Sequence, residues 1–243
     1  SKFSPGAGGA ECWFCQLAGW LASRGHEVKV FAEEGEAIPG VALTALGRGR
    51  GGRTLRWRRY LRAWQRWVAE VRPEVTHTLV RVWPADFYQP HHGVLRVNQG
   101  SAWQPGATRT ERSGRALLKQ LRPGHRVMLW AEAKMAREVV RWGALSSLVA
   151  AHMMDAYRLP LDRIRLTRNG IDLERFHPRN RALYRASLRQ EGKAAEDEVV
   201  GLFVAYQPRL KGLGLVLEAM AAEPAARRWK LWVVAGRDHD YFL

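Results

Sequence analysis

The 243-residue sequence is poor in cysteine, poor in lysine and free of long apolar runs. Its two cysteines are too few for the disulfide framework of a small secreted domain. No stretch reaches the roughly 18 apolar residues that a transmembrane helix needs, and no secretory leader is recognised at the start. Apolar residues still make up 47% of the chain, which excludes a disordered protein and suits one large or two ordinary domains.

The two cysteines, Cys12 and Cys15, form a C-x-x-C pattern. A zinc site would need two further ligands at suitable spacing, and no second cysteine pair exists. Both lie in an apolar helical pattern with Phe14 and Leu17. We therefore expect structural, buried thiols, as suits a protein of the reducing cytoplasm.

Basic residues are in excess, at 39 lysine and arginine against 23 aspartate and glutamate, for a formal net charge of +16. Only 7 of the 39 are lysine, and arginine pairs with phosphates more readily than lysine does. A genome biased towards arginine codons would give the same excess. The charge favours an anionic partner: nucleic acid, anionic lipid or a phosphorylated small molecule. Since no helix-turn-helix, RRM or zinc-finger signature is present, we expect no specific nucleic-acid partner.

Apolar runs alternate with amphipathic segments along the chain. Strands are predicted at residues 26–32, 41–46, 75–80, 145–151, 164–167, 199–204 and 230–235. Helices are predicted at residues 9–24, 54–72, 108–121, 124–141, 181–190 and 214–222, with a short one after residue 151. Residues 81–93 are predicted as a loop. This alternation indicates an α/β fold with parallel sheets, and a change of composition near residues 168–172 divides it into domains 1–168 and 169–243.

The predicted helix 54–72 carries an aromatic stripe, with most of its arginines off the stripe. A basic, aromatic amphipathic helix can lie on an anionic membrane. A helix that covers a sheet shows the same pattern, because it buries its apolar stripe and exposes its charges. The sequence favours the sheet-covering interpretation and leaves membrane contact open.

Two segments of the first domain carry groups suited to binding or catalysis. Gly8 and Gly9 precede a predicted helix, where backbone N–H groups bind anions, although a plain glycine turn is the simpler interpretation. The loop lacks the G-x-G-x-x-G spacing of dinucleotide-binding enzymes, which argues against an epimerase. His91 and His92 follow a predicted strand, where open α/β sheets place their ligands. A pair of ordinary surface histidines is the alternative.

A third candidate lies between the predicted strand 199–204 and the helix after it. Arg209 and Lys211 are two cations in this turn, and Gly212 completes it. Two cations in a strand-to-helix turn suit a diphosphate, and a solvated turn without function is the alternative.

In order along the chain, several motifs resemble those of glycosyltransferase family 4. They are the Gly8–Gly9 loop with its helix, residues 24–28, residues 169–172 with Phe176 and Pro178, residues 201–205, residues 211–212 and residues 218–219. Residues 86–93 and 203–212 are similar to the lipopolysaccharide core glucosyltransferase I branch. The resemblance covers almost the whole chain, and the order and spacing of the motifs together make it specific.

The resemblance implies a GT-B fold of two Rossmann-like domains that face a cleft, with the acceptor on domain 1–168 and the donor on domain 169–243. It implies retaining transfer of a hexose from a nucleotide-diphosphate sugar to a glycan or glycolipid acceptor, in cell-envelope polysaccharide or lipopolysaccharide synthesis. A UDP-linked donor is expected, with GDP and ADP left open. No metal or other cofactor is implied.

The resemblance also assigns roles to the candidate residues. The family holds the donor diphosphate with a basic pair at this turn, which assigns Arg209, Lys211 and Gly212 to the diphosphate. It places a polar residue of the post-strand loop near the reacting sugar, which assigns His92, with His91 beside it, to the catalytic site. The two glycines of the first loop, Gly8 and Gly9, would line the cleft.

The sequence departs from the family pattern in several places. Leu210 stands where the related branch often has arginine, and Ala205-Tyr206 stands where the family tends to have Gly-Arg, so we expect weaker diphosphate binding. The first strand is expected only as its end, and the second domain without its later half. We therefore expect a fragment truncated at both ends, with reduced activity or none.

A non-catalytic, degenerate α/β module that binds an anionic partner or a membrane remains the alternative function. In either case we expect a cytoplasmic protein. The basic segments 48–72 and 109–126 would give it peripheral contact with the inner face of the plasma membrane.

Overall fold

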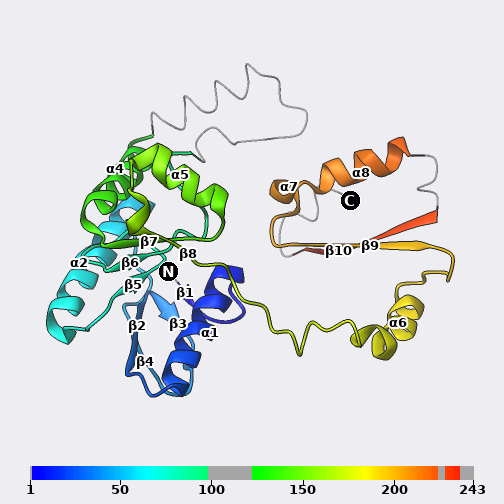
Figure 1. Ribbon diagram of the computed structural model, residues 1–243, viewed down its shortest axis with the longest axis horizontal. Helices are drawn as coiled ribbons and strands as arrows, with labels where there is room; N and C mark the ends of the chain where they lie inside the picture. The colour runs from blue at the N-terminus through cyan, green and yellow to red at the C-terminus, as the bar shows by residue number, and fades with distance from the viewer. Residues whose placement is uncertain (1, 98–121, 224–227, 236–243) are drawn as a thin grey trace. The chain divides into compact units, whose positions relative to one another are not determined.

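The computed structural model describes residues 2–97, 122–223 and 228–235. They form two compact units: the described residues up to Asn169, and those from Gly170 onward (Figure 1). Every ladder between named strands is parallel, and helices follow strands along the chain. This is the α/β architecture that the alternation of apolar and amphipathic segments predicts.

The first unit holds eight of the described strands, in three parallel sheets ordered β1-β3, β2-β4 and β5-β6-β7-β8. The strands are β1 (Lys2–Phe3), β2 (Val28–Ala32), β3 (Glu34–Gly35), β4 (Val41–Ala45), β5 (His77–Thr78), β6 (Phe87–Tyr88), β7 (Arg141–Ala144) and β8 (Ile164–Leu166). The helices are α1 (Gly9–Ser23), α2 (Arg53–Val71), α4 (Pro123–Glu138), α5 (Ser147–Tyr157) and the 3-10 turn η1 (Leu161–Arg163). No described helix is long and apolar enough to cross a membrane.

Helix α2 covers the strands with its aromatic stripe, which confirms the sheet-covering interpretation. Tyr60 and Trp64 are buried, and they donate hydrogen bonds to the carbonyl oxygens of Phe31 (2.9 Å) and Pro84 (2.9 Å). The arginines at positions 58, 62 and 66 remain exposed. The helix ends at Val71. Its C-cap residue, Arg72, has a left-handed backbone (φ 48°) and is followed by Pro73.

A second core lies between the four-stranded ladder and helices α4 and α5, around Trp142, Tyr88 and Met135. Here the prediction of a strand at residues 145–151 is wrong. The strand is β7, and Ser146 caps α5 by accepting a hydrogen bond from the backbone N–H of Val149 (3.2 Å). An N-cap serine stabilises the start of a helix, and here this preference outweighs the β propensity of the apolar residues after Ser147.

Two further predictions need correction around the loop at 81–93. The strand predicted at 75–80 is only two residues long, as β5, and β6 lies inside the predicted loop. A two-residue strand is too short to show an alternating pattern, so flanking prolines dominate the sequence signal. The helix predicted at 108–121 lies outside the described residues.

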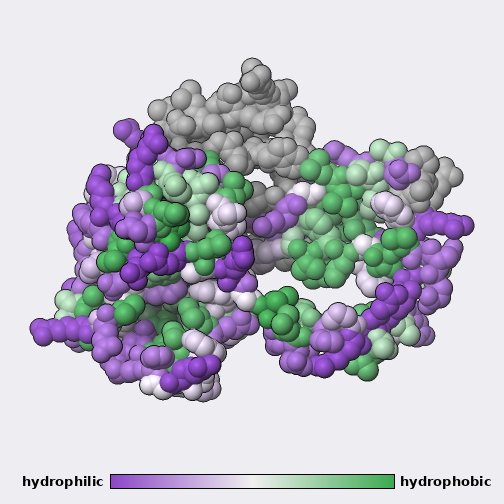
Figure 2. Space-filling model, viewed as in Figure 1, coloured by the Kyte–Doolittle hydropathy of each residue, from purple (hydrophilic) through white to green (hydrophobic). Residues whose placement is uncertain are grey.

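The second unit confirms the elements predicted for it. They are α6 (Asn180–Glu191), β9 (Val199–Ala205), α8 (Leu213–Ala222) and β10 (Trp229–Ala235). The residues predicted as a turn between β9 and α8 instead form a short helix, α7 (Pro208–Lys211). Strands β9 and β10 pair in parallel from Val199 opposite Trp229 onward. Leu202 and Val204 are exposed on one face of β9, and Figure 2 shows apolar surface (green) in this unit.

Candidate active site

The loop after β6 carries the predicted catalytic histidines. Strand β6 lies between β5 and β7, and the chain leaves its carboxyl end at Gln89. His92 is exposed, whereas His91 is partly buried with its ring 4.8 Å from that of Trp13 in α1. Burial, followed by the nearby charge of His92, lowers the pKa of His91, and the charge of Glu11 acts against that shift.

The glycine loop belongs to the same unit and leads into helix α1, whose Trp13 contacts His91. Helix α1 begins at Gly9, and the carbonyl oxygen of Gly8 accepts the first helical hydrogen bond, from Cys12 (2.8 Å). A side chain at Gly8 would meet only the flexible end of Glu11, so the position does not demand glycine. Helix α1, which follows the two glycines, contacts the loop after β6 through Trp13 and His91.

Sequence reasoning missed two residues of this neighbourhood, the partly buried His77 and the completely buried Gln89. His77 in β5 packs edge-on against Phe87 (4.9 Å between ring centroids) and Phe14 (5.6 Å). Burial lowers its pKa to about 4; hydrogen bonding from the Gln89 side chain opposes this shift, and the charge of His91 adds to it. Gln89 is completely buried. The residues are 12 positions apart in sequence, and only the pairing of β5 with β6 brings them together.

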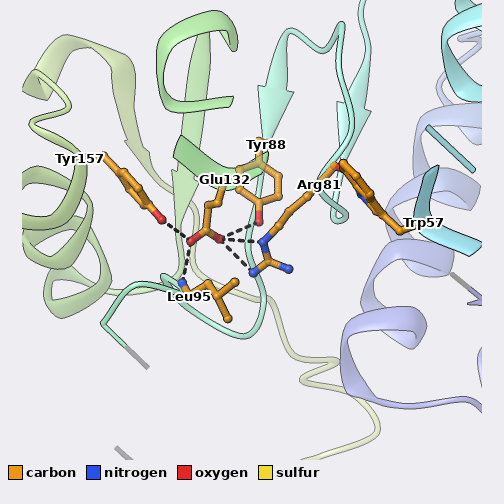
Figure 3. Close-up of polar contacts among 6 residues, drawn as sticks. All are labelled: Trp57, Arg81, Tyr88, Leu95, Glu132 and Tyr157. Atoms are coloured by element: carbon orange, nitrogen blue, oxygen red, sulfur yellow. Dashed lines mark hydrogen bonds and ion pairs between the residues drawn. The ribbon is translucent and has the colours of Figure 1, made fainter. Parts of the chain in front are cut away.

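On the opposite face of β6, the carboxylate of Glu132 joins segments that flank the histidine loop (Figure 3). Glu132 lies in α4 and is completely buried. Its Oε1 accepts hydrogen bonds from Arg81 Nε (3.2 Å), Arg81 Nη2 (2.9 Å) and the Tyr88 hydroxyl (3.2 Å). Its Oε2 accepts from the backbone N–H of Leu95 (2.7 Å) and the Tyr157 hydroxyl (2.7 Å). One carboxylate thus fixes the loops on both sides of β6 and the end of α5.

The charges of this group support one another. Burial alone would lower the pKa of Arg81. The charges of Tyr88 and Glu132, with the ion pair between Arg81 and Glu132, outweigh burial and raise that pKa. Burial raises the pKa of Tyr88 and of Tyr157, and the charge of Glu132 raises both further. Both tyrosines therefore remain protonated donors at neutral pH. The carbonyl oxygen of Arg81 also accepts a hydrogen bond from Trp57 in α2 (2.7 Å).

The predicted diphosphate residues lie in the second unit, at the carboxyl end of β9. Arg209 and Lys211 belong to α7, and the Lys211 side chain is exposed. Gly212 has a left-handed backbone (φ 88°), which favours glycine, and it precedes α8. The turn thus presents a cation and a helix start after a parallel strand, as a phosphate site would.

Neither the cysteines nor the potential metal ligands of the described residues form a reactive site. Cys15 is buried and Cys12 partly exposed, and both are free thiols. Burial, with the charges of nearby groups, raises the pKa of Cys15 to about 11, so it is an unreactive thiol at neutral pH. Among the described residues, no three side chains of the histidine, cysteine, aspartate or glutamate type gather as metal ligands would.

Parallel α/β units with polar groups at the carboxyl ends of their strands are typical of ligand-binding α/β proteins. The family model of glycosyltransferase family 4 matches residues 7–175. The chain therefore belongs to glycosyltransferase family 4.

Among solved structures, the chain is similar to WaaG, described as a glycosyltransferase involved in lipopolysaccharide biosynthesis. The TM-score is 0.71 at 19% sequence identity, over 96% of this chain and 61% of that chain. This likeness shows the GT-B fold, and the chain spans 61% of the length of WaaG. A search of the curated proteins finds no match.

Proposed function

We propose that the protein is a retaining glycosyltransferase that moves a hexose from a nucleotide-diphosphate sugar to a glycan or glycolipid acceptor of the cell envelope. Membership of glycosyltransferase family 4 over residues 7–175 carries the proposal. The likeness to WaaG supports lipopolysaccharide synthesis as the setting. The geometry of the two units supports a role for each of them.

In the second unit, Lys211 and Arg209 bind the donor diphosphate, with Gly212 allowing close approach of the backbone. Departure of the diphosphate places negative charge on the leaving group, and a cation fixed there stabilises that charge in the transition state. No metal is needed for this role. Leu210 and Tyr206, which replace the family's more usual residues, reduce the number of groups available to the diphosphate.

In the first unit, His92 and His91 orient the reacting sugar through hydrogen bonds to its hydroxyl groups. Retaining transfer passes through a sugar with oxocarbenium character, and polar groups fixed at its face hold it in the reactive geometry. Neither histidine is assigned as a nucleophile. Gly8 and Gly9 leave room for a ligand at the start of α1.

Nucleotide binding tests the donor site directly. We expect UDP or UDP-glucose to raise the melting temperature of the chain, and Lys211→Ala to abolish the rise, because the cation that meets the diphosphate is gone. GDP-mannose and ADP-heptose identify the preferred nucleotide. The matched control is Arg181→Ala, which removes an exposed cation of α6 in the same unit and should retain the full rise.

A cooperative melting transition that no nucleotide shifts would contradict the donor site. It would favour the alternative function, a non-catalytic α/β module that binds an anionic partner.

We further propose peripheral contact with an anionic membrane through the exposed arginines of α2. Since the aromatic stripe of α2 packs inward, this contact is electrostatic. Each basic residue near the surface contributes about 1 kcal/mol, so Arg62→Ala should weaken binding to phosphatidylglycerol vesicles about fivefold in sedimentation assays. Arg181→Ala is again the control, and high salt should release the protein. Equal binding to neutral phosphatidylcholine vesicles would contradict the electrostatic contact.

A further inference from the structure

A groove of about 630 Å³ lies between helices α2 and α4 of the first unit. The lining residues of each helix recur at steps of three or four positions, so each helix turns one face to this α2–α4 groove. The first turns of the two helices come close together, since a Cβ atom on Gly124 would lie 2.8 Å from Oγ1 of Thr54. The volume is that of a small-molecule site.

Three tryptophans form an aromatic wall of the α2–α4 groove. The Trp83 ring lies 6.0 Å from that of Trp57 and 5.7 Å from that of Trp130, between ring centroids. Trp57 is held in place by its hydrogen bond to the carbonyl oxygen of Arg81, and the Lys134 ammonium lies 5.3 Å from the centroid of Trp83. Trp130, by contrast, is 52% exposed. A fixed indole surface of this kind suits the C–H face of a sugar ring, which packs on aromatic rings as other apolar groups do.

Three arginines line the same groove: Arg58 and Arg62 from α2, and Arg126 from α4. All three are exposed, and no described residue forms a hydrogen bond or an ion pair with their guanidinium groups. No acidic side chain is present among the described residues that line the groove. Like charges gathered without a counterion repel one another, and a bound anion removes that repulsion. Guanidinium groups pair with phosphate through two parallel hydrogen bonds, so phosphate is the anion that fits them.

The α2–α4 groove and the histidine loop are connected by the Glu132 group. Trp83 follows Arg81 by two residues, and Arg81 forms an ion pair with Glu132. The same carboxylate accepts a hydrogen bond from the backbone N–H of Leu95, shortly after the loop that carries His92. Both features therefore belong to the unit that the family resemblance assigns to the acceptor.

We propose that the α2–α4 groove binds a phosphorylated sugar ring of the acceptor. The tryptophans, with Trp130 outermost, stack on the ring, and Arg58, Arg62 and Arg126 pair with its phosphate. The inference rests on the proposed function and gives its acceptor a chemical class, a glycan that carries phosphate. A neutral glycan would leave the arginines uncompensated, and a bare phosphate would leave the aromatic wall unused.

Calorimetric titration with glucose 6-phosphate tests the groove. The wild type should bind this probe about tenfold more tightly than inorganic phosphate or glucose, because each of these offers only part of the contacts. Arg126→Gln should weaken binding about tenfold, through loss of a charge-assisted hydrogen bond. Trp130→Ala should weaken it about fivefold, through loss of the apolar contact with the ring.

Three control variants match these changes and should bind the probe as the wild type does. Arg137→Gln removes an exposed arginine from the last turn of the same helix. Trp20→Ala removes a tryptophan of α1 that is 53% exposed, nearly the same as Trp130. Lys211→Ala removes the cation proposed for the donor diphosphate, so it excludes binding of the probe at that site. Unchanged melting temperatures show that the variants fold.

Several results would overturn the subsite. One is the absence of binding in the wild type; another is binding of inorganic phosphate as tight as that of glucose 6-phosphate; a third is binding that survives in Arg126→Gln or Trp130→Ala. If these two variants weaken binding to phosphatidylglycerol vesicles while glucose 6-phosphate does not bind, the groove serves a lipid surface and the subsite is wrong.

Thermal stabilisation by UDP, measured on the same samples, separates the subsite from the proposed function. If UDP stabilises the chain while glucose 6-phosphate does not bind, the subsite fails and the proposed function stands. If UDP has no effect while the groove variants lose glucose 6-phosphate, the groove is a sugar-phosphate site and the proposed function fails.

Discussion

Replacing Glu132 with glutamine should lower the free energy of unfolding by about 3–5 kcal/mol, the usual cost of removing one partner of a buried ion pair. Glutamine preserves the volume of the side chain. It leaves the Arg81 guanidinium without a countercharge. Its amide N–H₂ replaces one of the two oxygens, so it faces donors, either Arg81 and Tyr88 or Tyr157 and the Leu95 N–H. Denaturant unfolding measures the change. The slope of the transition should match that of the wild type, which confirms two-state behaviour.

Two variants separate the buried pair from ordinary helix charges. Glu138→Gln breaks an exposed ion pair with Lys134 on the same helix, and it should cost less than about 1 kcal/mol. The double variant Arg81→Met with Glu132→Gln removes both charges and keeps an amide oxygen as an acceptor, so it should be more stable than Glu132→Gln alone. If Glu132→Gln matches Glu138→Gln, the Glu132 group does not hold the loops as described.

The helices and strands of the second unit are predictable from its sequence because they are regular. Strand β9 is a continuous apolar run, and α8 follows a glycine that the turn requires. The start of α5 is predictable, since Ser146 lies at the beginning of segment 145–151 and serine is a common N-cap residue. Strand β6 was not predictable, because two residues between prolines carry no period.

The Glu132 group and the contact of His77 with Gln89 could not be found from the sequence, because their members come from separate segments of the chain. Glu132 looks like any acidic residue of an amphipathic helix, and its partners come from four separate segments. The histidines at 91 and 92 were visible because they are adjacent and follow a strand. His77 comes close to Gln89 only because β5 pairs with β6, and no local sequence pattern predicts that pairing.

His77 should make the first unit lose stability as the pH falls below neutrality. Its pKa is about 4 in the folded protein against 6.5 for an ordinary histidine, because burial disfavours the charged ring. The unfolded chain therefore binds more protons between these values, and the stabilising contribution is complete above pH 6.5 and lost progressively towards pH 4. The full loss is roughly 3 kcal/mol, of which about 2 kcal/mol falls between pH 7 and pH 5.

The variant His77→Phe isolates this contribution, because phenylalanine keeps the ring contacts with Phe14 and Phe87 and cannot titrate. Unfolding free energies of the wild type and the variant, measured by denaturant titration from pH 7 to pH 5, should diverge by about 2 kcal/mol, with the variant losing less. The exposed His26→Gln is the control and should follow the wild type. Glu11, His91 and His92 face the same neighbourhood, and His91 acts with the same sign because its pKa is also lowered. Parallel curves for His77→Phe and the wild type would show that His77 is protonated without cost in the folded protein.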